Sequence, residues 1–287
     1  MTDERLLRFY RWLAMSYRFP GRERFLRAVY NPMRRADDYY EGIIEFDRGL
    51  IHMNTASYIE WSIFFNRYYN EGMVDLIHTL VKPGFVCIDV GANVGSLTLV
   101  MAWATGPSGK VFAFEPHPVI YRRLAANVAL NRLWHVALYD QAISNQEGPV
   151  PFYTASPDDA NQAKSSIRRR EYAGVTREIT VQAVRGTSIR EFEALAACDF
   201  IKVDTEGHDF VVIQEIAPLI DRLRPHVVFE YSRRAWLAND IPLAPAIDFF
   251  KSRGYSLYNL KSRKPIHSAE QAPGLCDILC VPNALKR

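Results

Sequence analysis

From residue 82 onward, the apolar residues of this chain follow two alternating patterns. Short continuous apolar runs alternate with segments of helical spacing, as in Ile120, Leu124 and Val128 after Pro118. We expect six or seven strands among the apolar runs at residues 85–90, 110–115, 135–143, 179–184, 200–204, 226–231, 254–260 and 275–281. Helices are predicted at residues 96–105, from Pro118 onward, and around Val211, Ile213 and Ile216. This alternation indicates βαβ units that build a largely parallel sheet.

Residues 155–178 interrupt the alternation. They are polar, have no clear apolar period, and include the basic run Arg168-Arg169-Arg170. We predict a long loop here, and loops of this length in a compact domain usually bind a ligand or are disordered.

The N-terminal segment is strongly basic. Residues 1–35 contain nine arginines and three acidic residues, a net charge of +6 in a chain whose formal net charge is +3. A basic amphipathic helix is predicted from the apolar positions Leu6, Leu7, Tyr10, Leu13 and Ala14 and from Arg5, Arg8, Arg11 and Arg18. Such a helix rests on an anionic membrane, or it packs on the main domain or on a second subunit. We therefore expect a basic helical extension over residues 1–54 and the main domain over residues 55–287.

The composition is that of an ordinary globular protein, with 48% hydrophobic and 23% charged residues in 287 positions. A pI of about 8.6 does not by itself indicate nucleic-acid binding. The cysteines lack CxxC spacing, so we interpret them as reduced core residues: Cys87, Cys198, Cys276 and Cys280. Without a signal-peptide pattern or an apolar stretch of roughly 18 residues, we expect a cytoplasmic protein, with peripheral membrane contact through the basic helix as an alternative.

A glycine-containing turn follows the first predicted strand of the main domain. The turn runs from Gly91 to Gly95 and leads directly into the helix predicted at residues 96–105, which is typical of a ligand-binding loop. A dinucleotide fingerprint starting at Gly91 would need glycine at positions 93 and 96, where this chain has Asn93 and Ser96. The pattern therefore argues against a pyrophosphate ligand.

The distribution of charged residues also argues against a pyrophosphate ligand. No lysine or arginine occurs between Gly84 and Gly109, and Asp89 ends the strand before the turn. A carboxylate in this place would stabilise the ammonium group of S-adenosylmethionine and repel a phosphate. Glu115 ends the next strand, where Rossmann-like folds place an acid that accepts the ribose hydroxyl protons. The alternative for Glu115 is a residue beside a helix start, since Pro116 follows it.

Several motifs of this chain are spaced as in one known family. They are Asp89-Val-Gly-Ala-Asn93-Val-Gly95 with Thr98, Ala113-Phe-Glu115-Pro116, Asn127 and Asn131, Ile201-Lys-Val-Asp204-Thr-Glu206-Gly207-His208, Pro83-Gly84 and Asp277-Ile-Leu-Cys-Val-Pro282. Over residues 55–282 the chain resembles the FkbM family of methyltransferases. It departs from the family pattern at His208-Asp209, where an acid often follows the Glu-Gly pair, and in the Arg168–Arg170 loop.

The resemblance implies a class I methyltransferase fold, with a Rossmann-like sheet that is mostly parallel and has one antiparallel strand in the edge region. It also implies S-adenosylmethionine as the cofactor and a hydroxyl of a sugar, glycolipid or polyketide as the acceptor. The cofactor-binding residues expected on this basis are Asp89, Gly91, Asn93, Gly95, Thr98, Glu115, Pro116 and Ala142.

The candidate catalytic residues follow two later strands. Methyl transfer to a hydroxyl is an in-line displacement that needs positioning and the removal of one proton. Asp204, Glu206, His208 and Glu230 lie at or just after the carboxyl ends of predicted strands, where open α/β sheets bind ligands. We expect Asp204 beside the methyl group and His208 or Glu206 as the proton acceptor.

Other interpretations of these four residues stay open. Glu206 would alternatively cap the following helix, and His208 would be a solvated residue of its first turn. The four side chains together also suit a hard metal such as magnesium, although we expect a metal-free site.

Two other functions compete with O-methylation. An NAD-dependent reductase or epimerase is disfavoured by Asn93 and Ser96 and by the absence of a YxxxK pair in a suitable helix. An RNA-modifying enzyme would use Arg168–Arg170 and the N-terminal arginines, but these runs lack interleaved aromatic residues. We therefore expect a small-molecule or glycan acceptor, no nucleic acid, and a homo-oligomer as one possible assembly.

Overall fold

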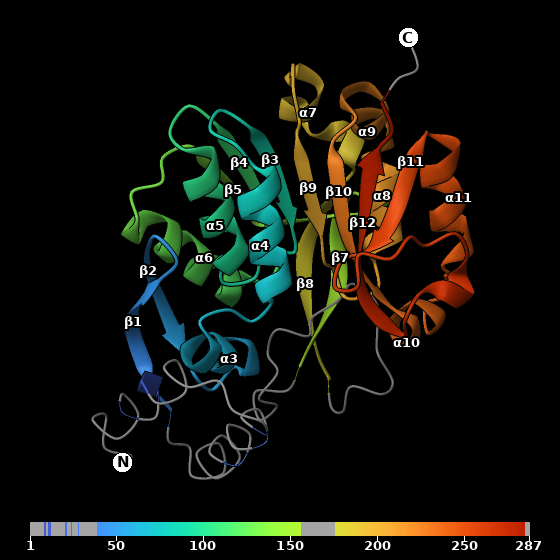
Figure 1. Ribbon diagram of the computed structural model, residues 1–287. Helices are drawn as coiled ribbons and strands as arrows, with labels where there is room; N and C mark the ends of the chain where they lie inside the picture. Colours follow the sequence, from blue (N-terminus) through green and yellow to red (C-terminus); the bar gives the residue numbers. More distant parts are fainter. Residues whose placement is uncertain are drawn as a thin grey trace.

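The computed structural model describes residues 39–155 and 176–284 and, nearer the N-terminus, residues 9, 11, 12, 21, 24 and 28. Its centre is a seven-stranded sheet with the order β11-β12-β10-β9-β3-β4-β5 (Figure 1). These strands are β3 (Val86–Val90), β4 (Lys110–Phe114), β5 (Val136–Tyr139), β9 (Phe200–Val203), β10 (His226–Ser232), β11 (Tyr255–Asn259) and β12 (Leu275–Pro282). Only β12 runs antiparallel to its neighbours β10 and β11. The expected mostly parallel sheet with one antiparallel strand near its edge is confirmed.

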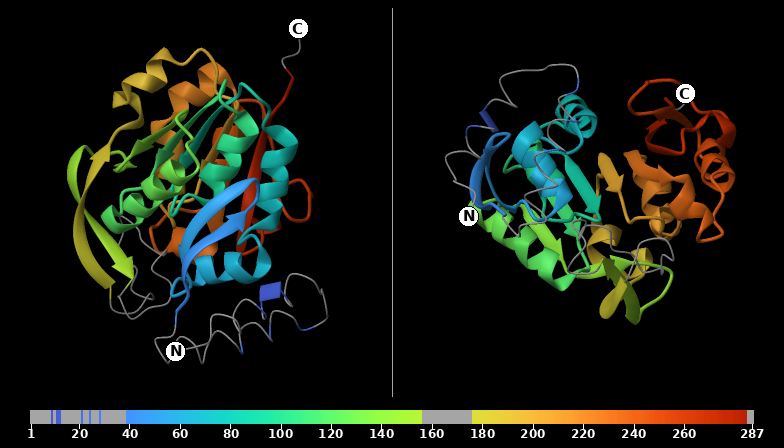
Figure 2. Two further views of the ribbon diagram at one scale, coloured as in Figure 1. Left: turned by 90° about the vertical axis from the view of Figure 1, so that its left-hand side faces the viewer. Right: turned by 90° about the horizontal axis from the view of Figure 1, so that it is seen from below.

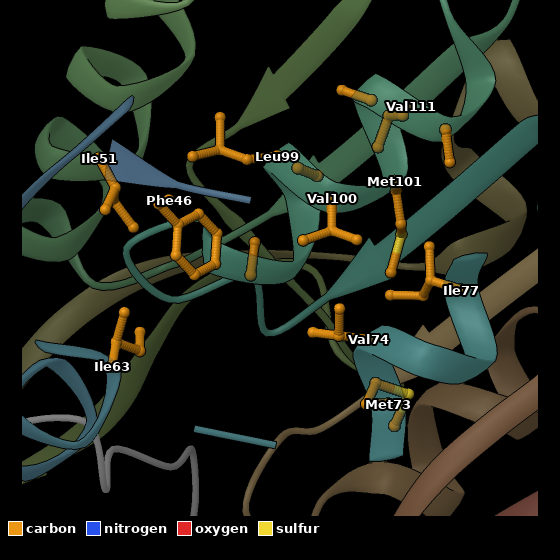
Figure 3. Packing of buried hydrophobic residues seen from close by; sticks show 14 of the residues in the cluster. Phe46, Ile51, Ile63, Met73, Val74, Ile77, Leu99, Val100, Met101 and Val111 are labelled. Carbon is orange, nitrogen blue, oxygen red and sulfur yellow. The ribbon is translucent and has the colours of Figure 1, made fainter. Parts of the chain in front are cut away.

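Helices cover both faces of this sheet (Figure 1). The helices are α3 (Tyr58–Asn66), α4 (Glu71–Leu80), α5 (Ser96–Thr105), α6 (Pro118–Leu130), α7 (Arg190–Ala194), α8 (Asp209–Glu215), α9 (Ala217–Leu223), α10 (Arg233–Leu237) and α11 (Ala244–Ser252), with short 3₁₀ turns η1 (Gly186–Ser188) and η2 (Ala269–Gln271). Successive strand residues alternate between two cores: Cys87 packs with α4, α5 and α6, whereas Ile88 packs with α8, α9 and α11. Figure 3 shows part of the first core, where side chains of α4, α5 and the N-terminal strands meet.

The helix predictions hold well. The predicted helix at residues 96–105 is α5, and Pro118 is the first residue of α6. The residues predicted around Val211 and Ile213 form α8, and Ile216 caps its end. In each case the apolar period and a local start or stop signal coincide, which is where sequence patterns are most informative.

The strand predicted at residues 135–143 is wrong as a single element, because the chain changes sheets at Asp140. Residues before it form β5 of the central sheet, and those after it form β6 (Gln141–Ile143) of a second sheet, ordered β6-β8-β7. No strand was expected at β7 (Gly148–Ala155), which contains Pro149 and Pro151. Proline disfavours central strands, but β7 lies at the edge of its sheet and tolerates both.

The long loop predicted at residues 155–178 is shorter than expected. Ala155 still belongs to β7, and β8 (Thr176–Val184) already begins at Thr176. Arg168-Arg169-Arg170 lie outside the described residues.

The expected helical extension is wrong for its last part. Residues 41–54 form an antiparallel hairpin of β1 (Glu41–Phe46) and β2 (Gly49–Asn54), shown against the helical layer in Figure 2. Its apolar residues alternate, so one face is buried in the first core. Helix α6 holds the hairpin, since the side-chain oxygens of Asn127 and Asn131 accept hydrogen bonds from the backbone N–H groups of His52 at 2.7 Å and Leu50 at 2.8 Å. The domain boundary at residue 54 stays a prediction.

The structure describes only a few residues of the predicted N-terminal helix. Of the predicted amphipathic helix, the structure describes only Phe9, Arg11 and Trp12, which are helical. Within the described part of the chain, no helix is both long and apolar enough to span a bilayer.

Candidate active site

A cavity opens at the carboxyl ends of β3, β4 and β9, the edge where open α/β sheets bind ligands. It encloses about 970 Å³ of empty space, including open solvent at its mouth. Its walls are formed by Ile59, Tyr69, Val90, Gly91, Ala92, Asn93, Ser96, Leu97, Phe114, Glu115, Pro116, His117, Ile120, Gln141, Ala142, Ile143, Phe152, Lys202, Asp204, Thr205, Glu206 and His208.

The turn after β3 is packed directly against the end of β9. Gly91 has a φ of +79°, and a Cβ atom there would lie only 1.9 Å from the carbonyl oxygen of Asp204. The N–H groups of Gly91 and Ala92 both donate to the carbonyl oxygen of Phe114, at 3.0 and 2.9 Å. Glycine is therefore needed at position 91 because two neighbouring strands approach the turn closely.

Glu115 lies on the cavity wall and is 7% exposed. Its carboxylate accepts hydrogen bonds at 2.9 Å from the backbone N–H groups of Asn93 in the turn and of His117 at the start of α6. Burial raises the pKa of Glu115 to about 7, although both hydrogen bonds lower it. The same carboxylate thus contacts both the turn and the helix start, so the two interpretations of this residue do not exclude each other.

Three of the eight expected cofactor residues lie behind the wall. Asp89 is fully buried, and its carboxylate accepts a hydrogen bond from the Thr98 hydroxyl at 2.6 Å. Its other oxygen lies 3.1 Å from the Lys202 ammonium group. Asp89, Thr98 and Gly95 do not line the cavity, whereas Gly91, Asn93, Glu115, Pro116 and Ala142 do. Asp89 is therefore placed to support the turn from inside the protein.

Lys202 on β9 is a wall residue that the sequence analysis missed. Its ammonium group donates to the carbonyl oxygen of Gly91 at 2.7 Å and lies 3.9 Å from the carboxylate of Asp204. Burial would lower its pKa, but the charges of Asp89 and Asp204 raise it above the usual value. The segment between Gly84 and Gly109 has no lysine or arginine, but the fold brings a cation to the turn from another strand.

Three of the four candidate catalytic side chains meet. Carboxylate oxygens of Asp204, Glu206 and Glu230 lie within 4.8 Å of one another, a spacing that would suit a metal ion. Burial raises the pKa of Glu230 well above its usual value, and the charges of Asp204 and Glu206 add to this. Asp204 and Glu206 line the cavity, but Glu230 does not.

His208 stands apart from this acidic cluster. Its side chain is buried at 3% exposure, which contradicts a solvated first-turn residue. Nε2 of His208 lies 3.2 Å from the hydroxyl oxygen of Ser144, a residue that follows β6. The imidazole still lines the cavity, so it and the carboxylates face the same space.

The turn between Asp204 and His208 is held by a residue that the sequence analysis did not single out. The carboxylate of Asp209 accepts hydrogen bonds from the backbone N–H groups of Thr205 at 2.7 Å and Gly207 at 2.9 Å. Burial, followed by the charge of Asp204, raises the pKa of Asp209 to about 7. Asp209 thus satisfies two backbone N–H groups of this turn at the start of α8.

Aromatic residues from two missed regions complete the wall. Tyr69 precedes α4 and lines the cavity, with 53% of its surface exposed. Phe152 comes from β7, and its ring centroid lies 6.4 Å from that of His117. Their sequence surroundings gave no local signal, because both reach the cavity only through tertiary packing.

Comparison with known proteins identifies the family. The sequence matches the "Methyltransferase FkbM domain" family over residues 89–257. The chain belongs to this family. It is thus a methyltransferase that uses S-adenosylmethionine, as the turn and Glu115 led us to expect. This membership favours the methyltransferase interpretation over an NAD-dependent reductase or epimerase.

Two methyltransferases are similar to this chain in sequence. "Methyltransferase sdnD" from Sordaria araneosa is 28% identical over 61% of this chain and 75% of its own length. "31-O-demethyl-FK506 methyltransferase FkbM" from Streptomyces tacrolimicus is 29% identical over 54% of this chain and 67% of its own length. Among solved structures, a putative rRNA-methylase from Clostridium thermocellum superimposes with a TM-score of 0.42 and 12% identity, covering 74% of this chain and 94% of its own.

The cavity fits the cofactor of the family. S-adenosylmethionine carries a positive sulfonium, an ammonium group and ribose hydroxyls. Glu115, Asp204 and Glu206 line the cavity as hydrogen-bond acceptors, and the ammonium group of Lys202 is already bound to Gly91 and Asp89. These acidic hydrogen-bond acceptors suit a cationic ligand with hydroxyl groups and not a polyphosphate.

Proposed function

We propose that the protein transfers a methyl group from S-adenosylmethionine to a hydroxyl of a sugar, glycolipid or polyketide-type acceptor. One observation carries this proposal: a single cavity joins the cofactor turn and Glu115 to two carboxylates and a buried imidazole. Carboxylate and imidazole groups accept the proton that a hydroxyl loses during methyl transfer. The name of the Streptomyces relative, which describes an O-demethyl acceptor, also supports the proposal.

In this mechanism the protein binds the cofactor, orients the acceptor hydroxyl and removes the proton of that hydroxyl. The cofactor, when bound, supplies an electrophilic methyl group. The turn at Gly91 would hold it by close backbone approach, and the carboxylate of Glu115 would accept hydrogen bonds from its ribose hydroxyls. Asp204 orients the acceptor hydroxyl, and His208 or Glu206 removes its proton, while the contact with Ser144 orients the imidazole.

A product analysis tests this function. Purified protein with S-adenosylmethionine carrying a ¹³C-labelled methyl group is offered methyl glycosides, a glycolipid extract and polyketide lactones, and the products are analysed by NMR. An O-methyl carbon signal that depends on the protein supports the proposal. Labelled N-methyl or C-methyl products, or transfer to RNA alone, would contradict it.

Three further expectations concern the acceptor class, the location of the protein and the need for a metal. We keep a small-molecule or glycan acceptor, a cytoplasmic location and a metal-free reaction as predictions. Membrane contact through the basic N-terminal segment is retained as an alternative, because a lipid-linked glycan would place the acceptor at a membrane surface. Chelator treatment checks the metal prediction, since full activity after EDTA and dialysis is expected.

A further inference from the structure

One buried lysine connects the two halves of the cavity. The side chain of Lys202 is 5% exposed and donates to the carbonyl oxygen of Gly91 at 2.7 Å. The same ammonium group lies 3.1 Å from Asp89 and 3.9 Å from Asp204. It therefore lies between the turn at Gly91, the strand that precedes this turn, and Asp204.

The two carboxylates differ in how much they depend on this lysine. Asp89 also has a hydrogen bond from Thr98, so it is held from two sides. The side chain of Asp204 is 41% exposed and belongs to the acidic cluster with Glu206 and Glu230. Among the described residues, Lys202 provides the ion pair of Asp204. Without that pair, repulsion within the cluster would displace the Asp204 side chain.

We infer that Lys202 is a positioning residue for methyl transfer, whose ammonium group fixes the carboxylate of Asp204 relative to the cofactor turn. This inference rests on the role of Asp204 in the proposed function. The competing explanation is that Lys202 only neutralises the buried carboxylate of Asp89 and so affects folding but not the reaction.

A double-mutant cycle on kcat distinguishes the two explanations. Lys202→Met is measured in the unaltered chain and in an Asp204→Asn chain. If Lys202 acts through Asp204, we expect kcat to fall about tenfold or more in the first background and less than about twofold in the second. An equal loss in both backgrounds, or no loss in the unaltered chain, would overturn the inference.

Lys202→Met leaves the carboxylate of Asp89 buried without a cation, which can prevent folding. The cycle is therefore repeated with Asp89→Asn in every chain, because a neutral amide removes that buried charge. If the Asp89→Asn/Lys202→Met chain folds but its kcat stays low, the inference is supported. If its kcat recovers together with its stability, the inference is overturned.

Two control variants complete the test. Lys202→Arg keeps the charge and should retain more activity than Lys202→Met. Arg185→Met removes a cation 3.2 Å from Glu215, outside the cavity, and should leave kcat unchanged.

Two further measurements distinguish a failure of this inference from a failure of the proposed function. The unaltered protein alone shows whether a hydroxyl is methylated, so the proposed function fails or stands before any variant is made, and the cycle runs on whichever acceptor is used. A crystal structure of the Asp89→Asn/Lys202→Met chain needs no acceptor. We expect the Asp204 carboxylate to move by more than about 0.5 Å, the tolerance of a productive site, and an unmoved carboxylate would overturn the inference.

Discussion

Replacing Gly91 with alanine tests the closest backbone approach in the site. Gly91 has a φ of +79°, and an added Cβ would lie 1.9 Å from the carbonyl oxygen of Asp204, a backbone atom that cannot rotate away. The left-handed conformation costs alanine about 1–2 kcal/mol, and overpacking against backbone adds about 1–3 kcal/mol. We therefore expect Gly91→Ala to lower the free energy of unfolding by roughly 2–5 kcal/mol.

Gly84 provides a matched control for this substitution. It also has a positive φ, of +86°, but a Cβ there meets no atom nearer than 3.8 Å. Gly84→Ala should lose only the conformational part, about 1–2 kcal/mol. Urea denaturation measures both losses, and calorimetry with S-adenosylhomocysteine measures binding, which we expect to weaken only in Gly91→Ala. Equal stability losses in the two variants would refute the close approach, and normal binding by Gly91→Ala would refute the role of this turn in holding the cofactor.

Three other predictions follow from the site. Glu115→Ala should weaken S-adenosylhomocysteine binding by about 1.5–3 kcal/mol in calorimetry with an unchanged circular dichroism spectrum, and unchanged affinity would limit Glu115 to the helix start. His208→Ala and Asp204→Asn should keep cofactor affinity within a few-fold and reduce turnover roughly 10²-fold, whereas full activity in both would shift attention to Glu206. Because its folded pKa of about 7 lies above the usual 3.8, Asp209 binds its proton more tightly when folded, and its contribution to stability is lost as pH rises through about 7. Urea denaturation from pH 5 to 8 should therefore show a smaller decline in Asp209→Asn than in the unaltered chain, and parallel curves would contradict this.

The parts of the fold that follow from the sequence depend on local signals. Apolar strand, glycine turn and helix follow one another between residues 85 and 105, so β3, the turn and α5 could be predicted together. Glu115 was found in the same way, because its distance from the turn is fixed by one βαβ unit. The cavity confirms that these two segments face the same space.

Two of the failed predictions concern β6 and β7, whose positions depend on how strands pair in the folded sheet. Nothing near Asp140 shows that the chain leaves one sheet for another, since β6 pairs with β8 some forty residues further on. The prolines of β7 are tolerated only because that strand lies at an edge, which is a property of the folded sheet. The hairpin of residues 41–54 was overlooked although its residues alternate, because the basic helical pattern before it dominated the interpretation of the whole segment.

The charge argument shows why the chemistry of a site cannot be read from its loop alone. The absence of lysine and arginine near the turn favoured a cationic ligand, yet Lys202, 111 residues after Gly91, donates to the carbonyl oxygen of that turn. Taken alone, this cation would favour a phosphate. Its charge, however, is offset by Asp89 at 3.1 Å and Asp204 at 3.9 Å, and Glu115 and Glu206 also line the cavity. The charge of the ligand that this cavity prefers is therefore set by the sum of the charges that the sheet brings together. That sum is negative and favours the cationic cofactor, whereas the residues of the loop alone are too few to decide this.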